Sequence, residues 1–326
     1  MKAHEMELKK RELSHKLKQL RTEDVPMTNY SNRRNEIRRL LQVKEVRDFY
    51  NKLQLLLRGQ AVTGSLEIPE LVEDRIKELL STYSGLYDEV QVVPVGTDGR
   101  AVIGAGEPAA KWDQITTTLE ELEASMDLIE MEDIRVGGYL LTGNAVIEDS
   151  IVNMSLYLEE LLVKSLAYGL DDGIINGQGD YVTTFEPIGI LMNLPAGNNV
   201  TAPFTAKDIL SKIELIDTSN KRDIGEVVAV MKRKTYYKDI LTISNTALPY
   251  PNINGVRVKF SGAVANDQII LGDFKEYILG ERNRMRIESS SNGSLFITEQ
   301  TIFKIVGRYD GKPNNEKAFV RIGKQV

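Results

Sequence analysis

The side chains that most often serve as bases or metal ligands are scarce in this sequence. Its two histidines, His4 and His15, stand far from each other in a charged N-terminal segment. Zinc needs clustered ligands and a histidine base needs a folded site, so we interpret both as solvated helix residues. The absence of cysteine excludes a disulfide framework, thiolate metal sites and a cysteine nucleophile.

One glycine-rich stretch has the form of a nucleotide site. Residues 104–109 (GAGEPA) match the G-x-G-x-x-A fingerprint of dinucleotide-binding proteins. That fingerprint works only if a helix N-terminus follows to receive the pyrophosphate, and here Pro108 and a Thr-rich stretch follow instead. Acidic pairs also occur within a long helical pattern, where we interpret them as a solvated face: Glu159-Glu160 and Asp171-Asp172. The sequence therefore predicts no enzyme, no cofactor and no metal site.

Charge divides the chain into two unlike parts. The formal net charge is −6, but residues 1–60 hold 15 Lys and Arg against 8 Asp and Glu, and the remainder holds 26 against 39. A basic head on an acidic body suggests that the head has its own partner. The most densely spaced cations of the head are Arg33, Arg34, Arg38 and Arg39. Contact with DNA phosphates or with an acidic scaffold is one interpretation of these residues, and a structural helix face is an equally good one. In the body, we find no basic stripe interleaved with aromatics, which argues against reading of nucleic-acid sequence.

The elements that must position these residues begin with helices. The head pattern predicts one helix around residues 6–20, a break at Val25-Pro26 and a second helix over about 32–58. A short helix follows over 70–80. The start of the chain has no apolar region of a secretory signal, and no run of about 18 apolar residues predicts a membrane span.

The middle of the chain predicts strands and then one long helix. Residues 89–95 and 101–103 flank Asp98-Gly99, a signal for a hairpin. Residues 111–136 look extended but poor in core residues, which predicts a long two-stranded arm over 91–135. Residues 145–175 then carry a continuous helical pattern that ends at Asn176-Gly177.

The remaining residues predict mixed helices and strands. Thr205 is expected to cap a helix over 207–216, and a short helix is expected over 235–241. The expected strands are 226–231, 256–260, 268–271, 295–306 and 317–322. Asn254-Gly255 predicts a turn, 273–279 a helical turn, and 308–313 a connection between the last two strands.

This order of parts, together with several short blocks, resembles the major capsid proteins of tailed phages of the Hong Kong (HK-97) type. The blocks lie between about residues 60 and 326: 65–69 (SLEIP), 139–150 (YLLTGNAVIEDS), 173–179 (GIINGQG), 187–190 (PIGI), 269–274 (IILGDF), Tyr277, 308–311 (RYDG) and 318–319 (AF). The resemblance implies an α+β fold with a spine helix, a β-hairpin arm, and peripheral and axial domains.

The resemblance also assigns the parts of the chain. Residues 1–60 look like the helical scaffold (delta) segment that a maturation protease often removes, and 61–90 like the N-arm with its short helix. Residues 91–135 correspond to the E-loop, which lies over a neighbouring subunit. Residues 136–180 and 291–326 correspond to the peripheral domain, and 181–290 to the axial domain.

The function implied is a structural subunit that forms hexamers and pentamers of an icosahedral head around double-stranded DNA. Its implied partners are further copies of itself, a portal, and a scaffolding protein or maturation protease, with assembly in the bacterial cytoplasm. Packaged DNA would be held without sequence specificity, and no membrane is involved. An acidic body agrees with this function because it repels packaged DNA from the wall.

Some members of this family join their subunits by an isopeptide bond between a lysine and an asparagine, with a glutamate as proton acceptor. The corresponding residues here are Lys111, Asn292 and Glu299. An attacking lysine must be neutral, which requires burial. The alternative interpretation is a surface lysine, a turn at Asn292-Gly293 and a strand glutamate.

Other functions remain open at this point. An encapsulin-type nanocompartment protein shares the fold but carries a cargo enzyme. A different class is an α/β enzyme with a helical dimerisation head, which predicts a small soluble dimer. The last is a regulatory protein whose residues 1–60 bind DNA in a salt-dependent manner.

Overall fold

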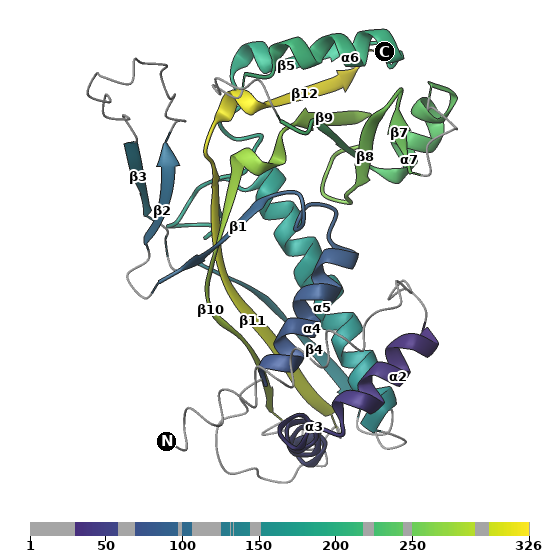
Figure 1. The fold of residues 1–326 in the computed structure, drawn as a ribbon, viewed down its shortest axis with the longest axis vertical. Coiled ribbons are helices and arrows are strands. Elements are labelled where there is room, and N and C mark those ends of the chain that lie inside the picture. Colours follow the sequence, from purple (N-terminus) through teal and green to yellow (C-terminus); the bar gives the residue numbers. More distant parts are fainter. Residues whose placement is uncertain are drawn as a thin grey trace, which may run out of the picture. The chain divides into compact units, whose positions relative to one another are not determined.

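A computed structural model of the chain describes residues 30–57, 69–96, 100–105, 125–130, 132, 134–143, 151–217, 225–243, 250–290 and 300–325. Its main helices are α2 (Tyr30–Leu40), α3 (Lys44–Leu57), α4 (Glu70–Tyr83), α5 (Ile151–Asn176), α6 (Ala206–Ser211) and α7 (Arg233–Thr235). Its strands are β1 (Gln91–Val95), β2 (Arg100–Ala105), β3 (Ser125–Glu130), β4 (Arg135–Gly143), β5 (Asn199–Ala202), β6 (Val228–Met231), β7 (Asn252–Ile253), β8 (Val256–Phe260), β9 (Gln268–Gly272), β10 (Tyr277–Ser290), β11 (Gln300–Pro313) and β12 (Phe319–Lys324). The mixture confirms the expected α+β class (Figure 1).

The chain divides into two compact units. The first comprises Met1–Thr82, Tyr139–Val163 and Arg286–Lys304, and the second comprises Tyr83–Gly138, Lys164–Met285 and Ile305–Val326. Helix α5 and strands β4, β10 and β11 contribute residues to both units. Within the described ranges, no helix is both long and apolar enough to cross a membrane.

In the first unit, the helix expected over 32–58 is two helices, α2 and α3. Ile37 and Leu40 of α2 and Phe49 and Tyr50 of α3 are buried. In one straight helix, Ile37 and Tyr50 would lie about 140° apart around the axis, on different faces, because each residue turns the helix by about 100°. The break is tightened by a hydrogen bond of 3.0 Å from the Val43 N–H to the Leu40 carbonyl, and it lets both apolar faces reach the core.

The second unit is built on a mixed six-stranded sheet, ordered β5-β12-β9-β6-β8-β7. Strand β12 pairs parallel with β5 and antiparallel with β9, and β6 pairs antiparallel with β9 and parallel with β8. The sheet's side chains pack with those of α6 and of residues 236–240 in one apolar core, which includes Ile209, Met231, Ile240 and Ile269. Thr205 caps α6 as expected, accepting a hydrogen bond from the Asp208 N–H. Asn254 and Gly255 both have positive φ and form the expected turn between β7 and β8.

The prediction that the strands on either side of Asp98-Gly99 pair as a hairpin is wrong. Strand β1 pairs in parallel with β10, and β2 pairs antiparallel with β3, from Arg100 opposite Glu130 to Ala105 opposite Ser125. Strand β1 stands at the edge of a four-stranded sheet ordered β1-β10-β11-β4. This position suits Pro94, which has no backbone N–H to donate and is therefore confined to edge strands. The two-stranded part of the arm is β2 with β3.

The long helix is confirmed, and two boundaries near the C-terminus differ from expectation. Helix α5 has 26 residues, or about 39 Å at about 1.5 Å per residue. The helical turn expected over 273–279 is shorter, at Phe274–Glu276, and β10 begins immediately after it. Residues 308–313, expected to be a connection, belong to β11.

Candidate functional site

A cluster of buried charged side chains joins four helices of the first unit. We call it the Arg75 cluster: Arg75 on α4, Glu36 on α2, Tyr50 on α3 and Glu159 on α5. The Nε atom of Arg75 lies 2.7 Å from Glu159 Oε2, and its Nη1 atom lies 2.6 Å from Glu36 Oε2. Tyr50 donates its hydroxyl hydrogen to Glu159 Oε1. Only 1% of Arg75 is exposed.

The electrostatics of this cluster keep the Arg75 guanidinium positively charged. Burial by itself would lower the pKa of the Arg75 guanidinium, but the charges of Glu159 and Glu36 raise it above its ordinary value. Such a group transfers no proton in a reaction at neutral pH. The Arg75 cluster therefore attaches α2 and α3 to α4 and α5 within the first unit.

The four arginines predicted to contact DNA or a scaffold differ in their exposure to solvent. Arg33 is buried, and its Nη1 atom lies 3.3 Å from Glu160 Oε2, so its charge is paired within the subunit. Arg34 is partly buried. Arg38 and Arg39 are exposed in the last turn of α2. For all four residues, contact with DNA or a scaffold stays a prediction.

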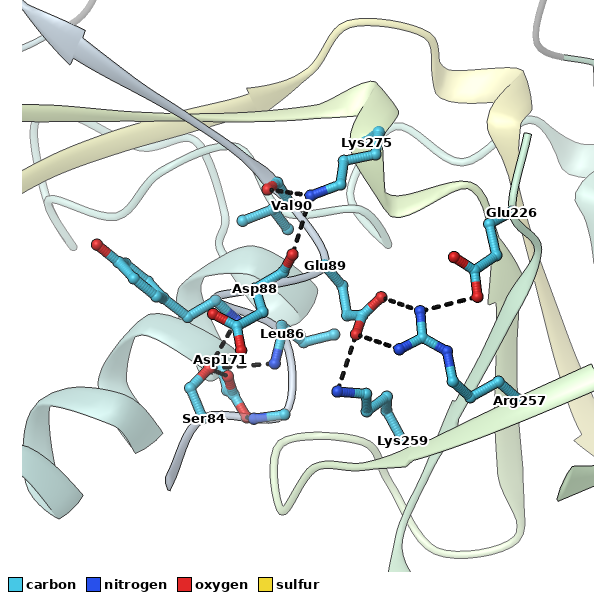
Figure 2. Close-up of polar contacts among 12 residues, drawn as sticks. Ser84, Leu86, Asp88, Glu89, Val90, Asp171, Glu226, Arg257, Lys259 and Lys275 are labelled. Atoms are coloured by element: carbon cyan, nitrogen blue, oxygen red, sulfur yellow. Dashed lines mark hydrogen bonds and ion pairs between the residues drawn. The ribbon is translucent and has the colours of Figure 1, made fainter. Parts of the chain in front are cut away.

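In the second unit, the turn between α4 and β1 is fixed by a buried aspartate (Figure 2). Asp171 of α5 accepts hydrogen bonds from the Ser84 hydroxyl at 2.5 Å, the Gly85 N–H at 3.1 Å and the Ser261 hydroxyl at 2.8 Å. Burial raises the pKa of the Asp171 carboxyl, although these donors oppose the shift. The interactions attach the turn at residue 84 and the segment after β8 to the long helix.

The raised pKa of Asp171 predicts the sign of a pH effect. The folded unit binds this proton more tightly than the unfolded chain, so the stability contributed by Asp171 is full below its unfolded pKa, about 3.9, and is lost as the pH rises through the folded pKa. We expect the advantage of wild type over Asp171→Asn in melting temperature to shrink from about pH 4 towards neutrality. Thermal melting of both proteins across that range measures it, and an advantage that grows with pH would contradict the argument.

A second carboxylate in the same turn binds two cations of strand β8 (Figure 2). Both Glu89 oxygens accept from Arg257, at 3.0 and 2.7 Å, and Lys259 Nζ lies 2.9 Å from Glu89 Oε1. Arg257 also contacts Glu226, which is largely exposed. Lys275 donates to the carbonyls of Asp88 and Val90, at 2.9 and 3.2 Å. The start of β1 is thus bound to the six-stranded sheet by charge-assisted hydrogen bonds.

Glu89 and Glu226 form a matched pair for a test of this attachment. Glu89→Gln keeps the shape of the side chain but removes the charge that binds Arg257 and Lys259, so we expect it to lower the free energy of unfolding by about 1–2 kcal/mol. Glu226→Gln removes the same charge from a side chain that is 71% exposed, and we expect a change within about 0.5 kcal/mol. Urea unfolding followed by circular dichroism compares them, and equal effects would contradict a special role for Glu89.

The chain that follows α5 is packed against the end of that helix. The N–H groups of Ile190 and Leu191 donate to the carbonyls of Ile174 and Ile175, at 2.8 and 3.0 Å. These are carbonyls that a helix end leaves without an intrahelical partner. The Gly189 N–H donates to the Gly177 carbonyl at 2.9 Å. The blocks GIINGQG and PIGI therefore form one closed structure at the helix end.

A buried carboxylate also lies beside this structure. Asp310 accepts hydrogen bonds from the N–H groups of Glu132 and Gly311, both at 2.8 Å, and burial raises its pKa. Burial, together with the negative charge of Asp310, raises the pKa of Tyr181 to about 12. Asp310 borders a cavity of about 450 Å³, but its oxygens are engaged by backbone donors. Among the residues that the structure describes, no three ligand side chains gather to hold a metal ion.

A match to a known protein family identifies the class of protein that these attachments stabilise. A family model described as the phage capsid family matches residues 64–323. The chain belongs to the phage capsid family. It is a structural capsid subunit that assembles with copies of itself into an icosahedral shell, and its place is the capsid of the virion. Encapsulin, the α/β enzyme and the DNA-binding regulator are not favoured.

Solved structures agree with the capsid fold at low sequence identity. The capsid of an empty GTA particle is 15% identical, with a TM-score of 0.54, covering 75% of this chain and 90% of that one. The protein of Microbacterium phage Oxtober96 is 14% identical, with a TM-score of 0.53, covering 82% and 95%. A chain of the procapsid of satellite phage P4, a particle that includes a size determination protein, is 12% identical, with a TM-score of 0.53, covering 78% and 99%. No curated protein matches the capsid chain in sequence.

Several predicted residues of the capsid subunit lie outside the described ranges. These are His4, His15, Lys111, Asn292 and Glu299, together with the helix expected around residues 6–20. The glycine-rich stretch at 104–109 is described only at Gly104 and Ala105, which belong to strand β2.

Sequence reasoning missed the two buried carboxylates of α5. We expected Glu159 and Asp171 on a solvated face, yet they are only 6% and 4% exposed. The signal was their register: Glu159 shares a helical stripe with Leu156 and Val163, and Asp171 shares one with Ala167 and Ile174, all of them buried. A carboxylate on an apolar stripe is buried only with hydrogen-bonding partners, and here arginine, tyrosine and serine provide them.

Contrary to the expectation for the body, one of its segments does interleave basic and aromatic residues. Residues 232–238 read KRKTYYK. Arg233, Lys234, Tyr237 and Lys238 are exposed in this segment.

Proposed function

We propose that this capsid protein is the major subunit of a tailed-phage head, forming hexamers and pentamers that close around double-stranded DNA. Membership of the phage capsid family over residues 64–323 is the observation that carries the proposal. We further propose that the head assembles in the bacterial cytoplasm, on a portal and with a scaffolding protein or maturation protease. DNA inside is held without sequence specificity.

The assignment of parts is proposed along with this function. Residues 91–135 act as the E-loop, which the separate β2–β3 ladder within this range supports. Residues 136–180 and 291–326 act as the peripheral domain, and the length of α5 supports a spine at its centre. Residues 181–290 act as the axial domain, and most strands of the six-stranded sheet fall in this range.

Residues 1–60 act as a scaffold-like segment, and 61–90 as the N-arm with helix α4. The exposed Arg38 and Arg39 are available there to an acidic scaffold or to DNA phosphates. We propose that the protein is not an enzyme, because buried carboxylates that the structure describes serve as internal attachments. Two such carboxylates are Asp171 and Asp310, whose oxygens accept hydrogen bonds from neighbouring groups of the chain.

We also propose an isopeptide bond between Lys111 and Asn292. The neutral Lys111 amine attacks the side-chain carbonyl carbon of Asn292, Glu299 accepts the amine proton, and the C–N bond of the Asn292 carboxamide breaks to release ammonia. Denaturing electrophoresis of assembled particles would show ladders of linked subunits. A single band at the mass of one chain, 36.6 kDa, would reject the bond without affecting the shell function.

Negative-stain electron microscopy of the purified full-length protein tests the shell function. We expect closed polyhedral particles under at least one assembly condition. Only small globular particles under all conditions would contradict the proposal. Long double-stranded DNA that copurifies from infected cells would support a phage head, and a folded cargo protein would instead indicate a nanocompartment.

A further inference from the structure

One short helical segment of the second unit carries an exposed face that is both basic and apolar. We call it the 233–241 face: Arg233, Lys234, Tyr237, Lys238 and Leu241. Tyr237 is 59% exposed and Leu241 is 47% exposed. Both side chains are large and apolar over most of their surface, and they lie among three cations.

The segment beneath this face is firmly anchored. It runs from α7 through a π-helical turn at Tyr236–Ile240 to a 3-10 turn at Leu241–Ile243. Tyr236 and Ile240 are buried in the core of the six-stranded sheet, and Tyr236 packs edge-on against Phe260 with ring centroids 5.4 Å apart. A π-helical turn is rare and occurs often at functional sites. The exposed side chains are therefore presented on a fixed scaffold.

With the residues that the structure describes, the contacts of Arg233 and Lys238 are weak. The Arg233 guanidinium lies 5.3 Å from the centre of the Phe260 ring, and Lys238 Nζ lies 3.3 Å from the exposed Asp267. Solvent-exposed pairs of this kind contribute little to stability. A partner with carboxylates can therefore engage these cations at little cost.

The composition of the face distinguishes between two kinds of partner. DNA phosphates would use the cations but leave Tyr237 and Leu241 in water. A protein interface uses both, because tyrosine and arginine are enriched in interface cores. Outside residues 1–60 this chain holds 39 Asp and Glu against 26 Lys and Arg, so a second copy offers the complementary charge.

We propose that the 233–241 face is a subunit contact that binds an acidic surface of a second copy of this chain. The inference rests on the proposed function, because capsid subunits must contact copies of themselves. A basic face that binds a different, acidic face makes a head-to-tail contact, and such contacts generate closed rings when the rotation from one subunit to the next closes. Rings are the form that hexamers and pentamers require.

Charge reversal in the full-length protein tests the contact. We expect Arg233→Glu with Lys234→Glu to reduce rings and shells at least about tenfold at equal protein concentration, because like charges then meet across the interface. The matched control, Lys207→Glu with Lys212→Glu on α6 and the turn after it, changes charge equally in the same unit and should assemble as wild type does. Tyr237→Ser, which changes no charge, should also weaken assembly. Sedimentation velocity and particle counts by microscopy give the yields, and thermal melting shows that each variant folds.

Each other outcome overturns the proposal. If the variants of the face assemble like wild type, the proposed subunit contact is rejected, and the shell function is not affected. Normal assembly with loss of salt-dependent DNA binding would assign the face to nucleic acid. Wild-type protein that forms no oligomer at all would contradict the shell function, and this contact with it.

Discussion

Replacement of Arg75 by methionine is expected to destabilise the first unit by about 3–5 kcal/mol, because it leaves the buried Glu159 without its cation. Arg75 is 1% exposed, and it contacts carboxylates from two other helices, Glu36 and Glu159. The loss should act first on α2 and α3, which the Arg75 cluster attaches to their neighbours. Hydrogen–deuterium exchange of the amides in residues 30–57 measures it, and we expect faster exchange there than in the six-stranded sheet.

Two variants separate the buried charge from a general effect of losing an arginine. Arg38→Met removes the same side chain from an exposed position on α2 and should leave exchange and melting close to wild type. Arg75→Met combined with Glu159→Gln removes both buried charges while keeping an acceptor for the Tyr50 hydroxyl, and it should recover part of the stability. A double variant no more stable than Arg75→Met would contradict the role assigned to Glu159.

Local features of the fold could be predicted because their causes are local. A threonine at the N-cap of α6 and an Asn-Gly turn before β8 act through neighbouring backbone atoms, so Thr205 and Asn254-Gly255 were found from sequence. The long helix α5 was found because its apolar pattern is continuous. The hairpin predicted from Asp98-Gly99 was wrong because strand β1 pairs with β10, nearly 190 residues further along the chain. No local pattern encodes such a partner.

The buried polar groups escaped prediction for a similar reason. Glu159 is stable inside only because Arg75 and Tyr50 arrive from other helices, and Asp171 only because Ser84 and Ser261 do. When each carboxylate is considered without its partners, its burial is unfavourable, so the sequence predicts that it is exposed to water. The family resemblance succeeded where this reasoning stopped, because the order of blocks reports the whole fold.

The block GIINGQG provides the second large expected effect. A methyl group on Gly177 would lie 2.3 Å from the Pro187 carbonyl oxygen and 2.5 Å from that of Gly173. Both are backbone atoms, so the chain after α5 must move and the bond between Gly189 and Gly177 must lengthen or break. We expect Gly177→Ala to lower the free energy of unfolding by about 3 kcal/mol and the melting temperature by roughly 10 °C.

Gly197→Ala is the matched control for this close approach, since its added methyl group would meet no heavy atom within 4 Å. It should melt close to wild type, so any large difference between the two variants reports the contact and not the loss of a flexible residue. In assembly, Gly177→Ala should give fewer shells, because residues 187–191 would no longer satisfy the last carbonyls of α5. A Gly177→Ala protein that melts and assembles like Gly197→Ala would show that the packing of 177 against 187 is dispensable, and would remove the physical reason for glycine at that position.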